Sequence, residues 1–437
     1  MPFDATFESL ATFECPDWFR DAKLGIWSHW GPQSVPRYGD WYARNMYREG
    51  TDQYRYHLRT YGDPSEFGYE DVVPLWKAER FDPHALMDQF VAAGARYFVS
   101  QAVHHDNFFN YDSAVNPWNS VKVGPGKDIV GLWKAAADQR GLPFGITEHL
   151  GASATWMKAT EGPDVPDPWY IEDPGWHQYW LESVTEMIDR YEPDLLYSDG
   201  PLPFGEQTYE PGLRAVAHLY NVNPRAVYQQ KDRSPEVSAV GIMDIERSQT
   251  PGIHPTPWQT DTSVGDWFYN VRDVYKTAGH VVEMLVDIVS KNGNLLLNVP
   301  QRPDGTLDAE CTRMLAELGA WTALCGEGIY GTRPFRVFGE GPSSVLIKGF
   351  TEDRVPWTSS DFRFTRRDNT VYAFQLAWPA DGRAVIRSFV DDRVTGVRLL
   401  GHGPVDFEQA EGILVVRLPG TPPTTVANCL AVDLEPS

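Results

Sequence analysis

Cysteine is scarce in this chain of 437 residues, and its spacing excludes two kinds of site. The four cysteines, Cys15, Cys311, Cys325 and Cys429, are scattered and form no Cys-x-x-Cys pair. Because structural zinc sites and disulfide frameworks depend on closely patterned cysteines, we expect neither. The sequence also lacks any run close to the roughly 20 apolar residues of a membrane-spanning helix.

Positive charge is in deficit as well. The 38 Lys and Arg residues face 60 Asp and Glu residues, which gives a formal net charge of -22. Such a field repels phosphate backbones and anionic lipid, so we expect no nucleic-acid partner and no membrane partner, whereas a neutral substrate is compatible with it. The first 18 residues contain no basic start followed by an apolar run, so the pattern predicts a cytoplasmic protein.

Aromatic residues, in contrast, are abundant. They make up 13% of the chain and include 16 Trp, which favours carbohydrate binding because aromatic faces pack against the C–H faces of sugar rings. Filling a large core explains the same enrichment equally well.

The chain up to about residue 335 alternates apolar runs with helical patterns. The candidate strands are 24–30, 96–105, 142–150, 193–199, 225–231, 241–246 and 294–300. Continuous apolar strands between helices indicate a parallel sheet covered on both faces, and this number of units predicts a (β/α)8-like barrel. A doubly wound open sheet is the alternative, although no G-x-G-x-x-G motif opens the first unit.

The pattern changes after residues 326–334. Short alternating runs separated by Gly, Pro, Asp and Asn follow, with no convincing helix among them. This pattern of short alternating runs predicts a C-terminal antiparallel β-sandwich. We therefore expect a catalytic barrel at residues 1–335 and a sandwich at residues 336–437.

Polar side chains end most of the candidate strands, where a parallel barrel places its functional groups. They are His29, His104, His105, Glu148, His149, Asp199, Asp232, Arg233 and Glu246. Any one of them could merely cap a helix, as Asp199 could, but the set points to one face. Two carboxyl groups about 5–5.5 Å apart would suit retaining glycoside hydrolysis. Spacing alone does not choose among Asp40, Glu148, Asp199, Asp232, Asp244 and Glu246.

Several motifs together resemble the α-L-fucosidases of glycoside hydrolase family 29. They are AKLGIWSHWGPQSVPRYGDWY (22–42), HHDNF (104–108), YDS (111–113), LLYSDG (195–200), DIVSKNGNLLLNV (287–299) and GEGIYGT (326–332). The resemblance runs in order from about residue 16 to 335, and the sandwich matches in position and strand character only. It implies an exo-acting enzyme that releases terminal fucose from fucosylated oligosaccharides or glycosides without a cofactor or metal.

The resemblance also implies roles for individual residues. Asp199 matches the nucleophile of a retaining mechanism with a covalent fucosyl-enzyme. The residues that match sugar-contacting positions are His29, Asp40, Trp41, His104, His105 and Arg233.

The acid/base residue is less clearly marked. Some relatives carry Glu at the position of Gln259, which has no titratable proton, so Glu246 is favoured, with Asp244 and Asp261 as alternatives. Should acid catalysis be lost, the protein would be a weak fucose-binding protein.

Other departures from the family pattern concern the sugar contacts. Asp40 stands where the family has Glu, Tyr197 where many relatives have Trp, and Glu148 where a Tyr-Ser pattern is common. Asn107 replaces a glycine and requires a positive φ. Trp267 is a candidate contact for the methyl group of fucose.

Two further alternatives remain. His29, His104, Glu148, Asp199 and Glu246 could form a metal centre, although the His-x-His of such barrels is absent from the first strand. A pocket with extra room would accept α-L-galactose instead of fucose. Linkage, aglycone and oligomeric state stay open.

Overall fold

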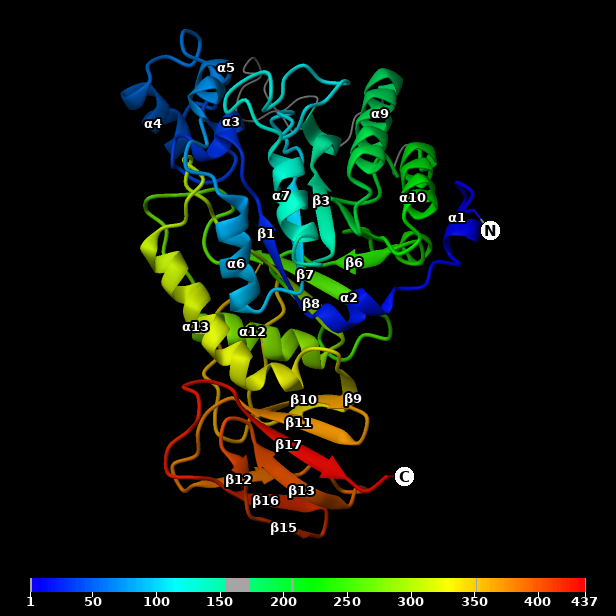
Figure 1. Cartoon of the computed structure of the whole chain (residues 1–437), viewed down its shortest axis with the longest axis vertical. Coiled ribbons are helices and arrows are strands. Elements are labelled where there is room, and N and C mark those ends of the chain that lie inside the picture. The colour runs from blue at the N-terminus through cyan, green and yellow to red at the C-terminus, as the bar shows by residue number, and fades with distance from the viewer. Residues whose placement is uncertain (1, 154–172, 206–207, 351, 437) are drawn as a thin grey trace.

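The structure is a computed structural model that describes residues 2–153, 173–205, 208–350 and 352–436. A parallel barrel surrounded by helices comes first in the chain, and antiparallel sheets follow it at the other end of the molecule (Figure 1).

Eight parallel strands close the barrel in chain order, and β8 pairs with β1. They are β1 (Leu24–Ser28), β2 (Tyr97–Gln101), β3 (Phe144–Glu148), β4 (Leu195–Ser198), β5 (Val227–Gln230), β6 (Ile242–Asp244), β7 (Trp258–Ser263) and β8 (Gly293–Asn298). Seven of these strands fall within or overlap the predicted runs. The (β/α)8-like barrel is thus confirmed, and the doubly wound open sheet is wrong.

Strand β7 has no apolar run to reveal it. Its sequence WQTDTS is mostly polar, yet all six residues are buried. Neighbouring polar groups satisfy two of them: the Gln259 amide donates to Gln229 Oε1 at 2.8 Å, and the Thr260 hydroxyl donates to the Ile245 carbonyl at 2.7 Å. A buried strand can therefore be polar where the barrel interior supplies hydrogen-bond partners.

Helices cover the outside of the barrel. The longer ones are α6 (Pro83–Ala93), α7 (Ile129–Asp138), α9 (Pro174–Tyr191), α10 (Glu210–Val222), α12 (Ala278–Ser290) and α13 (Ala309–Cys325). The shorter ones are α1 (Phe7–Leu10), α2 (Asp17–Ala22), α3 (Tyr42–Asn45), α4 (Asp52–Thr60), α5 (Tyr69–Val72) and α11 (Pro235–Ser238), with 3-10 turns η1 (Pro32–Ser34), η2 (Val73–Leu75), η3 (Leu150–Ala152) and η4 (Gly326–Gly328). Among the described residues, no helix has the length and apolar character needed to cross a membrane.

Local sequence signals set the ends of these helices. The Asp82 carboxylate accepts a hydrogen bond from the Ala85 N–H at 3.0 Å, and Pro83 occupies the first turn of α6. Gly94 ends the same helix at φ 109°, a conformation that favours glycine. Helix α12 ends at Ser290, directly before the sequence Lys-Asn-Gly, which is a common helix stop.

The C-terminal part consists of two antiparallel sheets. Its strands are β9 (Arg333–Glu340), β10 (Phe362–Arg367), β11 (Thr370–Gln375), β12 (Arg383–Ile386), β13 (Val394–Leu399), β14 (Gly403–Pro404), β15 (Phe407–Ala410), β16 (Ile413–Arg417) and β17 (Asn428–Leu434). Phe364 and Leu430 of the larger sheet share one buried core with Ile386 and Leu414 of the smaller sheet. The sandwich is therefore confirmed, while the division at residue 335, which falls within β9, stays a prediction.

A buried ion cluster joins the barrel to the sandwich. Asp287 of α12 is fully buried and forms ion pairs with Lys291, at 2.7 Å, and with Arg363 of β10. Burial alone would raise the pKa of Asp287, but the two cations outweigh it and lower the pKa below its usual value. Asp287 is thus the anion shared by two buried cations.

We expect Asp287→Ala to be strongly destabilising, because it leaves Lys291 and Arg363 buried without a counterion. The free energy of unfolding should fall by about 3–5 kcal/mol in urea titrations followed by tryptophan fluorescence. The matched control, Glu317→Ala, removes an exposed partner of Arg313 and should cost less than about 1 kcal/mol. A loss in Asp287→Ala as small as in the control would contradict this account of the cluster.

Candidate active site

A cavity of about 380 Å³ lies at the C-terminal ends of the barrel strands. Its wall consists of Trp27, His29, Asp40, Trp41, His104, His105, His149, Tyr197, Asp199, Lys231, Glu246, Asp261, Trp267 and Phe350. Residues far apart in the sequence meet here because parallel strands end at the same face of the barrel. All the residues predicted to be catalytic or to contact the sugar line this cavity except Glu148 and Arg233, and the strand-end residue Asp232 also lies outside it.

Asp199 and Glu246 approach each other on either side of one ammonium group. Lys231 Nζ lies 2.7 Å from Asp199 Oδ1 and 2.7 Å from Glu246 Oε2. The two carboxylate oxygens can therefore be no more than twice that distance apart. This limit agrees with the separation of about 5–5.5 Å in retaining glycosidases and lies below the 6.5–9.5 Å or so of inverting ones.

Asp199 is held in its ionised form. Burial would raise its pKa, but the Lys231 cation and the hydrogen bond from His105 keep the pKa well below the usual value. His105 Nε2 lies 3.3 Å from Asp199 Oδ2, and the Tyr197 hydroxyl donates to Oδ1 at 3.2 Å. A carboxylate fixed and charged in this way is suited to nucleophilic attack.

Glu246 is shifted in the opposite direction. Burial raises its pKa, and the carboxylates of Asp261 and Asp199 add to the rise, although Lys231 opposes it. The pKa of Lys231 itself is raised well above its usual value, since Asp199, Asp261 and Glu246 outweigh its burial, and so it remains a cation. Two carboxyl groups with pKa values pushed apart are the pattern of an acid and its partner base.

We expect Lys231→Met to move the pH–activity profile to higher pH. Removing the cation raises the pKa of Asp199 and of Glu246, so ionising Asp199 and deprotonating Glu246 both require a higher pH. Measuring kcat/KM against pH tests this shift of both limbs. Lys134→Met, which removes the cation from a surface pair with Asp138, is the control and should leave the profile in place. An unchanged profile in Lys231→Met would show that Lys231 does not set these two pKa values.

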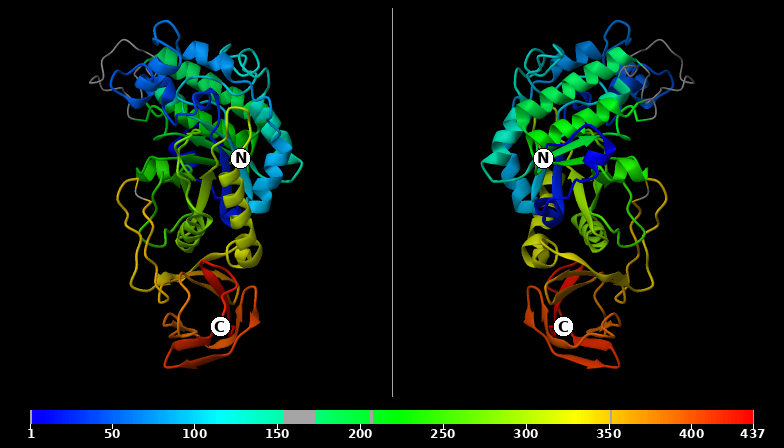
Figure 2. Two further views of the ribbon diagram at one scale, coloured as in Figure 1. Left: turned by 90° about the vertical axis from the view of Figure 1, so that its left-hand side faces the viewer. Right: turned by 90° about the vertical axis from the view of Figure 1, so that its right-hand side faces the viewer.

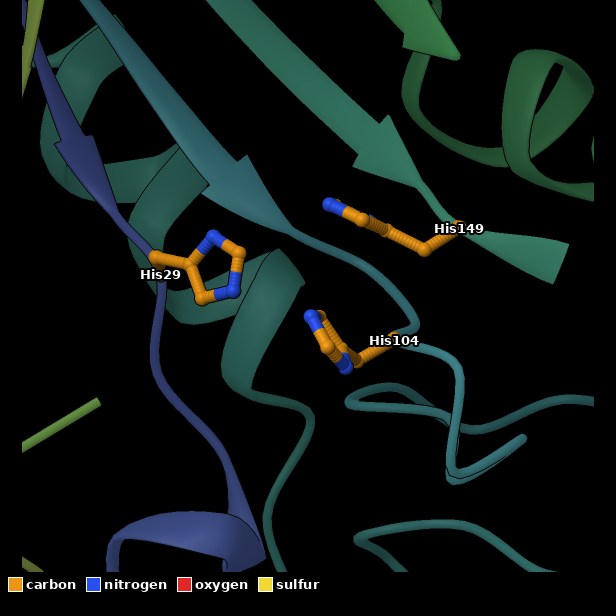
Figure 3. Close-up of side chains that lie close together, drawn as sticks. All are labelled: His29, His104 and His149. Atoms are coloured by element: carbon orange, nitrogen blue, oxygen red, sulfur yellow. The ribbon is translucent and has the colours of Figure 1, made fainter. Parts of the chain in front are cut away.

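Three histidines form the innermost part of the site. His29 follows β1, His104 lies beyond the end of β2 and His149 follows β3, and their side chains point toward one another (Figure 3). Neighbouring ring centroids are 4.6 to 5.2 Å apart. Burial lowers the pKa of all three, that of His149 to about 3, so the rings are neutral and can both donate and accept hydrogen bonds.

The His29 ring has two nitrogens that can hydrogen-bond to a ligand. Both of its ring nitrogens are buried without a partner in the described part of the protein. A neutral polyhydroxylated ligand would satisfy them, because a hydroxyl group donates and accepts. One ring nitrogen from each of His29, His104 and His149 lies within 4.8 Å of the other two, so neutral imidazoles could also bind a metal ion there. The expectation of no metal stays a prediction.

Aromatic rings form the side of the cavity. Trp267 lies 5.3 Å from the His29 ring, and the Arg247 guanidinium lies 5.0 Å above the Trp267 ring. Trp41 lies 5.9 Å from the His105 ring. The indole faces offer apolar surface beside the hydrogen-bonding histidines, which is the combination that a sugar ring requires.

Two residues where the sequence departs from the family pattern fit their positions. Asp40 is in the cavity wall, and burial followed by the Asp266 charge raises its pKa well above the usual value. A protonated Asp40 would donate a hydrogen bond. Asn107 has φ 54°, so the positive φ expected at this position, where the family motif has glycine, is confirmed.

Glu148 does not line this cavity, and its contact with the sugar stays a prediction. Glu148 is 1% exposed, and its Oε2 accepts hydrogen bonds from the Leu150 N–H at 2.8 Å and the Trp180 indole at 3.2 Å. These contacts make it a support for the loop after β3. Arg233 also lies outside the cavity: it is exposed and lines a second, adjoining cavity.

The alternative acids are less well placed than Glu246. Asp244 is 1% exposed and accepts a hydrogen bond from Gln259 at 3.0 Å. Asp261 lines the cavity but accepts from the Tyr197 hydroxyl at 3.3 Å. Gln259 is fully buried inside the barrel, so its side chain does not reach the cavity.

Four wall residues were missed from the sequence, and one of them is Trp27, which lies within the first predicted strand. Lys231 is the last residue of the predicted strand 225–231, but the residues singled out from the sequence are Asp232 and Arg233, which follow it, whereas β5 ends at Gln230. His149 was noted at a strand end but not assigned to the site. Phe350 comes from the C-terminal part of the chain, and no local signal links it to the barrel.

Comparison with known proteins identifies relatives over nearly the whole chain. A profile of the α-L-fucosidase family matches residues 1–327, and a profile of the α-L-fucosidase C-terminal domain matches residues 356–433. Tissue α-L-fucosidase of Rattus norvegicus is 32% identical over 95% of this chain and 88% of its own length. Plasma α-L-fucosidase of Homo sapiens is 31% identical over 94% and 88%, respectively.

Solved structures agree with these matches. The Thermotoga maritima α-fucosidase, crystallised in complex with fucose, superimposes with a TM-score of 0.83 at 27% identity, covering 98% of this chain and all of the other.

Proposed function

Because the chain belongs to the α-L-fucosidase family, glycoside hydrolase family 29, we propose that it hydrolyses terminal α-L-fucosyl residues with net retention, through Asp199 and Glu246. The distance limit set by Lys231 is the observation that carries this proposal, since it brings the two carboxyl groups within reach of one glycosidic bond.

The first step forms the glycosyl-enzyme. A carboxylate oxygen of Asp199 attacks the anomeric carbon, and the bond from that carbon to the glycosidic oxygen breaks. Glu246 gives its proton to the departing oxygen, so the leaving group departs as a neutral alcohol. The low pKa of Asp199 and the raised pKa of Glu246 provide the required protonation states.

The second step restores the enzyme. Glu246, now ionised, takes a proton from a water molecule, which attacks the same carbon and releases Asp199. Two displacements at one carbon leave the sugar with its original α configuration. The three neutral histidines hold the hydroxyl groups, and Trp267 faces the apolar methyl side of the sugar.

The test is an assay of the purified protein with 4-nitrophenyl glycosides while proton NMR follows the anomeric signal of the first product. We expect α-L-fucose to appear first and to mutarotate afterwards. Initial release of β-L-fucose would exclude the double displacement. Faster turnover of the α-L-galactoside than of the α-L-fucoside would show that the preferred sugar is α-L-galactose and not fucose. Binding of fucose without any turnover would support the alternative of a weak fucose-binding protein. The residue that suggests this alternative is Gln259, which lies buried inside the barrel.

A further inference from the structure

The segment between β9 and β10 links the sandwich to the active site. In Figure 2 this segment, coloured gold, runs from the sandwich along the side of the barrel. Glu352 fixes it there through ion pairs with Lys276, at 2.9 Å, and Arg247, at 3.8 Å. Because Arg247 directly follows Glu246 in the chain, the segment is anchored beside the catalytic pair.

Three large apolar side chains of this segment are exposed. Leu346, Ile347 and Phe350 are 62%, 40% and 72% exposed, and they lie within five residues of one another. Such a cluster costs free energy in water and marks a surface that binds something. Phe350 lies in the wall of the catalytic cavity, so the cluster is at its mouth.

A second cavity of about 620 Å³ adjoins the first. Lys231, Glu246 and Phe350 line both cavities, so the two meet at the acid/base side of the catalytic pair. A general acid must lie against the oxygen that it protonates, and the leaving group extends outward from that oxygen. The second cavity is therefore where the leaving group would lie.

The walls of the second cavity match an amphipathic ring. Ile347, Phe350 and Pro251 supply apolar surface, while Arg233 and Gln249 supply hydrogen-bonding groups. A pyranose has C–H faces that pack on apolar surface and hydroxyl groups around its edge, whereas a purely aromatic aglycone would leave the polar groups unused.

We propose that this second cavity binds the sugar ring that leaves, and that Phe350 of the C-terminal segment forms its apolar wall. This inference rests on the proposed fucosidase function, and it assigns the C-terminal part of the chain a role in choosing the substrate. It also gives Arg233 a place in substrate binding outside the fucose pocket.

The experiment compares Phe350→Ala with the unaltered protein on two substrates. A fucosylated disaccharide has a leaving sugar, whereas α-L-fucosyl fluoride has none. We expect kcat/KM for the disaccharide to fall about 3- to 10-fold more than kcat/KM for the fluoride, a difference that corresponds to one aromatic contact. Leu346→Ala is the matched control, because Leu346 is also a largely exposed apolar residue of this segment but lines neither cavity, and neither rate should change.

Other outcomes would overturn the proposal. Equal losses on both substrates would place Phe350 at the fucose pocket, and no loss on either would remove it from substrate binding. If the loss of both activities accompanies dissociation of an oligomer in light scattering, the apolar cluster is a contact between copies. If the unaltered protein fails to hydrolyse the fluoride, the proposed fucosidase function itself is wrong, a failure that is distinct from the loss of selectivity in the variant.

Discussion

Replacing Asp199 with alanine will lower kcat for 4-nitrophenyl α-L-fucoside by about ten-thousand-fold, while the protein remains folded. The reason is that no other group in the cavity wall can form the bond to the anomeric carbon from the position of Asp199, next to His105 and Lys231. Asp138→Ala, which removes an exposed carboxylate, is the control and should keep full activity.

Azide gives this variant a distinctive product. The space left by the Asp199 side chain admits the anion, which attacks the anomeric carbon once, opposite to the leaving group. The expected product is therefore β-L-fucosyl azide, identified by NMR. If Asp199→Ala retains more than about one tenth of the original kcat, with an unchanged circular dichroism spectrum, Asp199 is not the nucleophile.

Replacing Glu246 with alanine will have the second-largest effect, and the effect will depend on the leaving group. For a fucosylated disaccharide, whose leaving oxygen needs a proton, kcat/KM should fall about 100- to 10,000-fold. For fucosyl fluoride, which departs without strong acid assistance, the loss should be much smaller. Glu236→Ala, on the exposed surface of α11, is the control and should behave like the unaltered protein.

Azide separates the two carboxyl groups by stereochemistry. In Glu246→Ala, Asp199 still forms the fucosyl-enzyme, and azide then displaces it, so two inversions give α-L-fucosyl azide. The opposite configurations expected from Asp199→Ala and Glu246→Ala assign the two roles independently of rate. Equal losses on all substrates without azide rescue would move the acid role to Asp261 or Asp40, the two other carboxyl groups in the cavity wall.

Much of the barrel was predictable because most of its strands coincide with continuous apolar runs in the sequence. Strand β7 was not predictable, because WQTDTS is mostly polar. Its burial depends on hydrogen-bond partners from other strands, such as Gln229 for Gln259. The sandwich was predictable from short alternating runs, because its core comes from alternate residues of both sheets.

The candidate site shows where local sequence information ends. The family resemblance pointed to Asp199 and Glu246. Which of Lys231 and Arg233 enters the cavity, however, depends on where β5 ends and on the direction that the chain then takes. Glu148 ends a strand as predicted, yet its carboxylate turns toward Trp180. Phe350 reaches the cavity only through the packing of the C-terminal segment on the barrel, which no local pattern encodes.

Trapping the covalent intermediate tests the central claim most directly. The reagent is 2-deoxy-2-fluoro-α-L-fucosyl fluoride. Its fluorine at C2 destabilises the positively charged transition states of both steps, while its fluoride leaving group speeds the first step. The covalent glycosyl-enzyme should therefore accumulate. Peptide mass spectrometry should then find one deoxyfluorofucosyl group on the peptide that contains Asp199, and none after Asp199→Ala. A label on any other residue, or steady turnover with no label, would contradict the account.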